Sequence, residues 1–183
     1  MNERPDNERR KNEREQVIDR YFAGIAENTF HTQLGVVDPP LVNYVTNLLI
    51  RFVRLDNFYR VRSLSGQPIM DIHELVNEAT QRLGDAKREV LRHVGDFALF
   101  WLGVFPESFQ KNGERTTKYN DYCEHGKRSY EIASQIETSD DEAPEGSVLE
   151  SLSESFELCA YGIQEVRREW ERNEDGSTGP III

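Results

Sequence analysis

The chain has 183 residues, of which 37% are hydrophobic and 30% are charged, and its formal net charge is -11 at pH 7. This length supports one domain with a substantial core, and no apolar run approaches the length of a membrane span. The polar N-terminal segment cannot act as a secretory signal, so we expect a cytoplasmic protein. The acidic balance argues against nonspecific binding to nucleic acid or to an anionic membrane, which depends on an excess of Lys and Arg.

The N-terminal part of the chain changes character after residue 15. Residues 1–15 are almost entirely charged or amide side chains, so we expect a charged arm that is either disordered or a solvated extension of the next helix. From Gln16 to Glu27, apolar residues recur at helical spacing and predict a first amphipathic helix. Residues 31–37 lack this periodicity and are predicted to form a connector.

A second helix is predicted to begin at Asp38, because this residue can cap free amides and is followed by two prolines that favour the first helical positions. The apolar pattern continues to about Arg54. A basic and aromatic patch overlaps the end of this helix, and its arginines are Arg51, Arg54, Arg60 and Arg62. Such a patch can bind RNA, although docking on the acidic C-terminal helix of the same chain or of a second copy is the simpler interpretation.

The third helix carries its own start signal. Asp71 and Glu74 match the pattern of a capping box, which predicts a helix that begins here and runs to Leu83. Gly84 is expected to end or kink this helix, and Asp85 can start the next one.

The most apolar part of the chain, residues 91–109, predicts a buried central helix that ends at Phe105, before Pro106. A tyrosine-rich helix is predicted from Tyr119 to Ile136. Glycine inside a helix costs about 1 kcal/mol relative to alanine, so we expect the close approach of two helix backbones to compensate at each glycine within a helical pattern, with a ligand against the backbone as the alternative. The glycines concerned are Gly95, Gly103, Gly126 and Gly162.

Residues 138–146 combine acidic side chains with proline and glycine and predict a solvated acidic linker. Ser147 can then cap a last amphipathic helix from Val148 to Trp170. Residues 173–183 are expected to form a disordered tail.

All of these elements are helical, and no segment alternates long enough to require a strand. We therefore expect an all-α fold, namely a single-domain bundle of five or six helices over residues 16–172. Between Glu137 and Asp175 the chain has thirteen acidic residues and three arginines, so nearly all of the negative excess lies in its C-terminal part.

Two segments resemble a pattern of an uncharacterised family of small bacterial all-helical proteins. They are HVGDFALFWLGVFPESF, from His93 to Phe109, and YNDYCEHGKRSYEIAS, from Tyr119 to Ser134. In that pattern a Gly-Asp pair opens an apolar helix that ends in a Phe-Pro-Glu turn, and a tyrosine-rich helix with a glycine and a basic residue follows. The resemblance implies a helical fold, and it implies no chemistry because the family has no established activity.

His93 and Asp96 lie three residues apart and share a helix face, which makes them candidates for a ligand or metal site. The side chains that can join them as ligands of a divalent metal are Glu107, Tyr119, Tyr122 and His125. Carboxylate-bridged helical bundles need a Glu-x-x-His motif on each of two helices, and the sequence has none. We therefore expect no cofactor and keep a divalent metal as the alternative.

Asp96 also has a structural interpretation. It lies among aromatic residues, and an unpaired buried carboxylate costs several kcal/mol, so a cationic partner is required. Lys127 and Arg128 of the following helix are the predicted partners.

The sequence contains no catalytic motif. Cys123 and His125 are two residues apart and face different sides of a helix, and Cys123 and Cys159 are expected to be reduced core residues. The long amphipathic helices and the charge asymmetry favour a non-enzymatic interaction or regulatory module that forms a homodimer or binds a protein partner. The first alternative is a metal-binding or small-ligand-binding protein or enzyme with a site around Asp96, and the second is RNA binding through the patch from Arg51 to Arg62.

Overall fold

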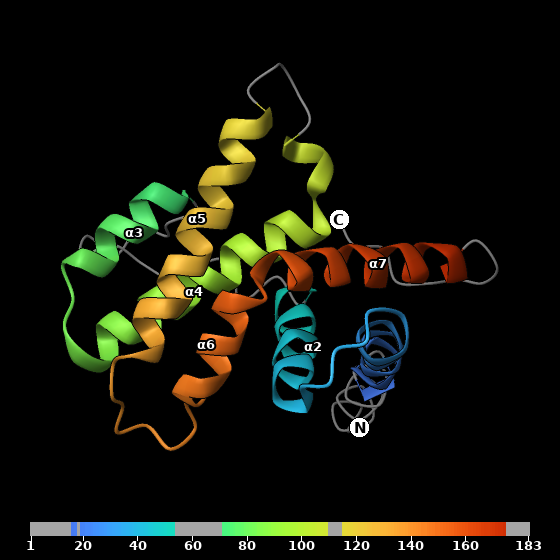
Figure 1. Cartoon of the computed structure of the whole chain (residues 1–183), viewed down its shortest axis with the longest axis horizontal. Helices are drawn as coiled ribbons and strands as arrows, with labels where there is room; N and C mark the ends of the chain where they lie inside the picture. Colours follow the sequence, from blue (N-terminus) through green and yellow to red (C-terminus); the bar gives the residue numbers. More distant parts are fainter. Residues whose placement is uncertain (1–15, 18, 54–70, 110–114, 175–183) are drawn as a thin grey trace, which may run out of the picture.

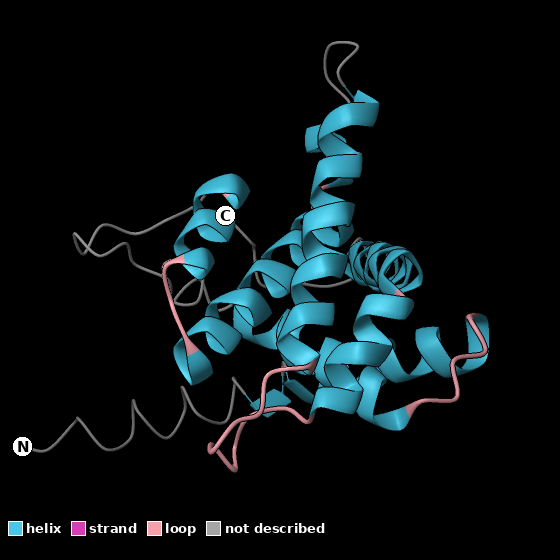
Figure 2. Cartoon of the chain, turned by 60° about the vertical axis from the view of Figure 1, so that its left-hand side comes forward, coloured by secondary structure: helices cyan, strands magenta, loops and turns pink. Residues whose placement is uncertain are grey.

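The computed structural model describes residues 16–17, 19–53, 71–109 and 115–174. These residues form helices and connecting loops with no strand among them, which confirms the all-α class (Figure 2). None of the described helices has the length and hydropathy needed to cross a membrane. The predicted arm over residues 1–15 lies outside the described residues, as do Arg54, Arg60 and Arg62 of the basic patch.

The N-terminal helix is longer than predicted. Helical residues up to Glu27 lead directly into a π-helical turn, η1 (Asn28–Gln33), so the first part of the predicted connector is helical. The turn buries Phe30 completely against Gly162, and this tertiary contact is not visible in the local pattern. The next helix, α2 (Pro39–Val53), starts as predicted, with the Asp38 carboxylate accepting a hydrogen bond from the Leu41 amide at 3.1 Å.

The helix α3 (Ile72–Thr80) also starts at its predicted cap, because the Asp71 carboxylate accepts hydrogen bonds from the amides of His73 and Glu74. It ends at Thr80 rather than at the predicted Leu83. Gly84 then adopts a φ of 54°, which glycine reaches without strain, and begins the central helix.

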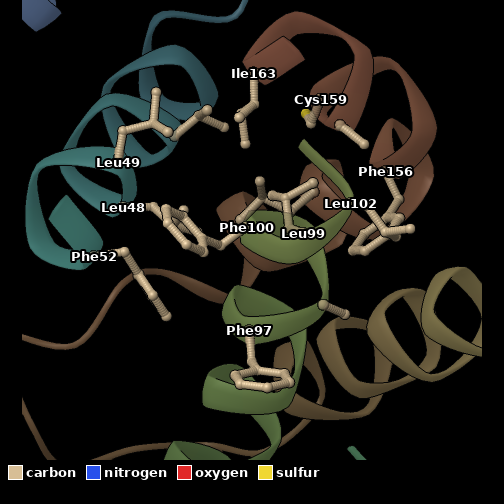
Figure 3. Close-up of a cluster of buried hydrophobic side chains, with 14 of the residues drawn as sticks. Leu48, Leu49, Phe52, Phe97, Leu99, Phe100, Leu102, Phe156, Cys159 and Ile163 are labelled. Carbon is tan, nitrogen blue, oxygen red and sulfur yellow. The ribbon is translucent and has the colours of Figure 1, made fainter. Parts of the chain in front are cut away.

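The central helix α4 (Gly84–Val104) packs against α3, α5 (Arg115–Ser134) and α7 (Phe156–Glu174), and the short η2 (Pro106–Phe109) follows it (Figure 1). Figure 3 shows Leu99, Phe100 and Leu102 of α4 facing apolar side chains of α2 and α7 in the core. The apolar central segment therefore forms the middle of the fold, as the sequence predicts.

The prediction of one unbroken helix from Val148 to Trp170 was wrong. The chain forms α6 (Gly146–Glu154) and α7, with a break at Ser155 that adds a helix to the predicted five or six. The break occurs because α6 packs mainly against α5, whereas α7 packs mainly against α4. The expected Ser147 cap is also corrected: the helix begins at Gly146, and the Ser147 hydroxyl donates to the Glu145 carboxylate instead.

The four helical glycines give space to bulky side chains of neighbouring elements. A Cβ atom on Gly95 would lie 2.6 Å from the ring of Tyr130. The other three positions are occupied in the same way, by Ile163 at Gly103, by Phe156 at Gly126 and by Phe30 at Gly162. The predicted close approach of a second backbone was therefore wrong at these glycines, because side chains of neighbouring elements occupy the space instead.

Candidate functional site

A cluster of polar side chains surrounds Asp96 in the middle of α4. Asp96 is 2% exposed, and its Oδ1 accepts hydrogen bonds from the hydroxyls of Tyr44 and Tyr130 at 2.6 and 2.7 Å. Its Oδ2 lies 3.3 Å from Nη2 of Arg51 and 3.4 Å from Nη1 of Arg92. Three helices thus supply one buried network, since Tyr44 and Arg51 belong to α2 and Tyr130 belongs to α5.

The helical repeat explains why the side chains around Asp96 lie on the same helix faces. Tyr44 and Arg51 are seven residues apart on α2, and Arg92 and Asp96 are four apart on α4, so each pair lies on one helix face. The Arg51 guanidinium also lies over the Tyr44 ring, 5.6 Å from its centroid. On the other side of Asp96, the missing side chain of Gly95 leaves the space that the Tyr130 ring occupies.

The neighbouring charges keep Asp96 ionised. Burial alone raises the pKa of Asp96, but Arg92, Arg51 and the two tyrosine hydroxyls outweigh burial and lower the pKa below its ordinary value. Burial and the charge of Asp96 raise the pKa of Tyr44 and Tyr130, so both hydroxyls stay protonated and donate. These three groups do not titrate near neutral pH, so the cluster is suited to hold charge and geometry rather than to move protons.

A cleft of about 950 Å³ opens between α2, α4 and the acidic loop, which we define as residues 138–145. Tyr44, Arg51 and Arg92 line this cleft and also contact Asp96, so the buried aspartate lies directly behind its lining. A third arginine, Arg88, and the amides of two asparagines complete this side. The carboxylates that line the cleft come from the first half of α4 and from the acidic loop, and they are Asp85, Glu89, Asp140, Asp141, Glu142 and Glu145.

Arg88 differs from the other two arginines because no carboxylate pairs with it directly, although the charges of Asp85 and Asp140 act on it from a greater distance. It is 4% exposed, its Nη2 donates to the Pro144 carbonyl at 2.5 Å, and its Nε has no hydrogen-bond acceptor. In the part of the chain that the structure describes, Arg88 forms no ion pair. Burial and the charge of Arg92 lower the pKa of Arg88 and outweigh the opposite effect of Asp85 and Asp140, yet an arginine remains a cation at neutral pH. A buried cation without a directly paired counter-ion is costly, which favours an anion at this end of the cleft.

The predicted metal ligands face different neighbours. His93 stacks on Phe52 in the core, and Glu107 pairs with Arg167 of α7 at 2.9 Å. His125 lies edge to face against His73 of α3, with ring centroids 5.1 Å apart.

Two tyrosines complete the predicted ligand set, and both lie among aromatic rings. Tyr119 and Tyr122 pack against Phe109, and burial raises the pKa of Tyr119 to about 12. Among the described residues, no group of three or more His, Cys, Asp or Glu side chains is arranged to hold a metal ion. The predicted metal site is therefore not assembled in this part of the chain.

The predicted cationic partners of Asp96 were wrong. Lys127 is directed to α7, where it pairs with Glu157 at 3.1 Å, and Arg128 is exposed. The α5 residue that reaches Asp96 is Tyr130. Lys127 is 40% exposed, so its ammonium keeps part of its hydration instead of being desolvated against Asp96.

Arg51, the one described arginine of the basic patch, points inward to Asp96. Docking of the patch on the acidic C-terminal helix of the same chain or of a second copy stays a prediction. Cys123 and Cys159 are free and buried, as expected of core residues, and burial raises the pKa of Cys159 to about 12. Self-association, which the amphipathic helices favour, stays a prediction.

Sequence reasoning missed four residues of this site, which are Tyr44, Arg88, Arg92 and Tyr130. A signal existed for Arg92, because it precedes Asp96 by one helical turn and so shares its face. The roles of Tyr44 and Tyr130 depend on how α2 and α5 cross α4, and local spacing does not specify these crossings.

Comparison with known proteins gave no match: no family model, no curated protein and no solved structure matches this chain. The resemblance of its two central segments to a helical bacterial family stays a prediction.

Proposed function

We propose that this protein is a non-enzymatic binding module that takes a small anionic ligand in the cleft between α2, α4 and the acidic loop. The observation that carries the proposal is the convergence of Arg51, Arg88 and Arg92 on this cleft, with Arg88 buried and not paired with a carboxylate. Asp96 partly neutralises Arg51 and Arg92 and holds both in place. Arg88 is the cation that a bound anion would neutralise.

The chemistry of the cleft fits an anion with several oxygen atoms. Guanidinium groups present N–H donors in a planar fork that matches carboxylate and phosphate oxygens. The side-chain amides of Asn43 and Asn47 add neutral donors beside them. A volume of about 950 Å³ lies within the range of small-molecule sites.

Binding is favoured over catalysis because the polar groups of the Asp96 network behind the cleft are each held in one protonation state. The pKa of Asp96 is lowered and that of Tyr44 is raised, so neither group exchanges a proton near neutral pH. The two cysteine thiols are buried in the core, and burial raises the pKa of both. This supports the non-enzymatic class that the sequence favours.

Isothermal titration calorimetry with inorganic phosphate, sulfate and succinate tests the proposal. We expect saturable binding of at least one of these anions to the parent chain, and an affinity at least about tenfold lower, or ~1.4 kcal/mol, for Arg88→Met. Arg168→Met is the matched control, because Arg168 is exposed on α7 and pairs there with Glu165. The proposal is wrong if the parent binds none of the three anions, or if Arg88→Met binds them as well as the parent does.

The melting temperature of ligand-free Arg88→Met gives a second readout. If Arg88 is kept for a ligand, removing this buried cation leaves stability unchanged or raises it, because methionine fills similar space without a charge. If Arg88 serves only to clamp the acidic loop through the Pro144 carbonyl, the variant melts at a lower temperature and binds the anions as tightly as the parent does. This combined result would contradict the place of Arg88 in the binding site.

A further inference from the structure

We infer that the ligand of this cleft is a zwitterion, with an anionic group against the arginines and an ammonium or guanidinium group against the acidic loop. This inference rests on the proposed binding function and adds the chemical class of the ligand. It follows from the second set of charges in the cleft, because the carboxylates of the acidic loop line the same space as the three arginines.

Of the four carboxylates of the acidic loop that line the cleft, those of Asp141 and Glu142 are available to a ligand, whereas those of Asp140 and Glu145 are already hydrogen-bonded. Asp140 accepts a hydrogen bond from the Glu142 amide at 3.0 Å, and Glu145 accepts one from the Ser147 hydroxyl at 3.2 Å. The carboxylates of Asp141 and Glu142 line the cleft as well, and neither bonds to any part of the chain that the structure describes. Both residues are exposed, so a cationic group entering from solvent can reach them.

The acidic loop is tied to α4 at two points, which fixes these carboxylates relative to the arginines. The Ser139 hydroxyl donates to the Asp85 carboxylate at 2.9 Å, near the start of the loop. Near its end, Arg88 donates to the Pro144 carbonyl. Because Asp85 and Arg88 are three residues apart on α4, one helix face positions both ends of the loop at the cleft.

The arginines and the acidic loop together select ligands by the signs of the charges that the ligands carry. A dianion gains contacts with the arginines but meets repulsion from the loop, and a dication meets the reverse. A molecule with one charge of each sign avoids both penalties. Amino acids, ω-amino acids and short peptides belong to this class.

A chain-length-matched series tests the inference on the full-length protein, namely glutarate, δ-aminovalerate and cadaverine, measured by isothermal titration calorimetry. We expect δ-aminovalerate to bind at least about tenfold more tightly than glutarate, and cadaverine to bind most weakly. The double variant Asp141→Asn/Glu142→Gln should lose this preference, with weaker binding of δ-aminovalerate and tighter binding of glutarate. The matched control is Glu150→Gln/Glu154→Gln, two exposed positions on α6, which should keep the parent preference.

The remaining outcomes separate this inference from the proposed function. If phosphate and glutarate bind in an Arg88-dependent way and δ-aminovalerate has no advantage, the zwitterion inference fails and the anion-binding function stands. If the preference for δ-aminovalerate persists in the double variant, the acidic loop is not its cause and the inference fails. If cadaverine binds most tightly, or if none of the three compounds of the series binds, the zwitterion inference fails. The proposed function is overturned as well only if phosphate, sulfate and succinate also fail to bind.

Discussion

Asp96 shows how one ionised side chain can organise a core that is otherwise aromatic and aliphatic. Its two oxygens face two hydroxyls and two guanidinium groups, and each of these groups would cost free energy if it were buried alone. In one network the groups compensate one another, because a low dielectric strengthens every satisfied contact and penalises every unpaired group. The stability of the network therefore depends on Asp96, the residue that all the other groups contact.

Replacing Asp96 tests this dependence. Asp96→Ala removes the carboxylate that pairs with both Arg92 and Arg51, and breaking a buried pair from one side typically costs about 3–5 kcal/mol. Arg51 is 29% exposed and can be partly rehydrated, so we expect the lower end of this range. Asp96→Asn keeps a hydrogen-bond acceptor for the tyrosines and should recover part of the loss. Urea denaturation measures both variants, and an Ala variant as stable as the parent would contradict a structural role for the carboxylate.

The same residue predicts an acid-sensitive fold. The pKa of Asp96 in the folded chain lies below its ordinary value of 3.8, so its contribution is fully present above that pH and is lost as the pH falls through the folded pKa. The free energy of unfolding of the parent should therefore decline below about pH 4. Asp96→Asn, which has no titrating group at this position, should decline less between pH 7 and pH 3 in the same buffers. Parallel curves for the two proteins would show that other carboxylates control the acid response.

At the scale of single residues, the sequence predicted that Asp96 needs a cationic partner but did not predict which residue provides it. A carboxylate among Phe97, Phe100 and Trp101 requires a cation, and the structure provides two. The position of Lys127 on the next helix along the chain predicts a contact with Asp96, yet the crossing of α4 and α5 directs Lys127 to Glu157. Arg51 comes from a helix more than forty residues earlier, and a contact of that sequence separation is invisible to local spacing.

At the scale of helices, the start signals at Asp38 and Asp71 were predictable, whereas the start at Gly146 and the break at Ser155 were not. The caps at Asp38 and Asp71 are local hydrogen bonds, so their residue types were enough to predict them. The break at Ser155 leaves the apolar spacing unchanged, and it arises because α6 and α7 pack on different helices. Tertiary packing decided that boundary, and a single-helix pattern does not contain this information.

Gly126 is the helical glycine whose substitution tests this packing best. A Cβ atom there would collide with the Phe156 ring of α7 and lie 3.0 Å from Ala98 of α4. Gly126→Ala should destabilise the fold by about 1–3 kcal/mol through overpacking, although alanine is the better helix former.

Gly24→Ala is the matched control for this substitution. Gly24 is exposed in the first helix, and a Cβ atom added there would meet no other atom within 4 Å, so alanine should stabilise by up to about 1 kcal/mol. Chemical denaturation of both variants gives the comparison. A stabilising Gly126→Ala would mean that the junction of α4, α5 and α7 can relax at little cost.

At the scale of the whole molecule, charge is distributed unevenly. The net charge is -11, and the segment from Glu137 to Asp175 contains thirteen acidic residues and only three arginines. On α7 these arginines pair with glutamates three or four residues away, which offsets part of the local repulsion. The remaining like charges repel one another in the compact state and oppose association of two copies at low ionic strength.

Salt should therefore stabilise the fold. Raising NaCl shortens the Debye length from about 30 Å at 0.01 M to about 10 Å at 0.1 M, which screens repulsion among exposed carboxylates more than it weakens the buried Asp96 network. If screening contributes about 1 kcal/mol, the melting temperature rises by about 2–4 °C for a chain of this size. Asp96→Asn should show the same rise, because its network is shielded from solvent. The melts are repeated at two protein concentrations, since a rise that depends on concentration would reveal self-association instead. A fall in melting temperature with salt would show that attraction within the surface ion pairs outweighs the repulsion of the acidic excess.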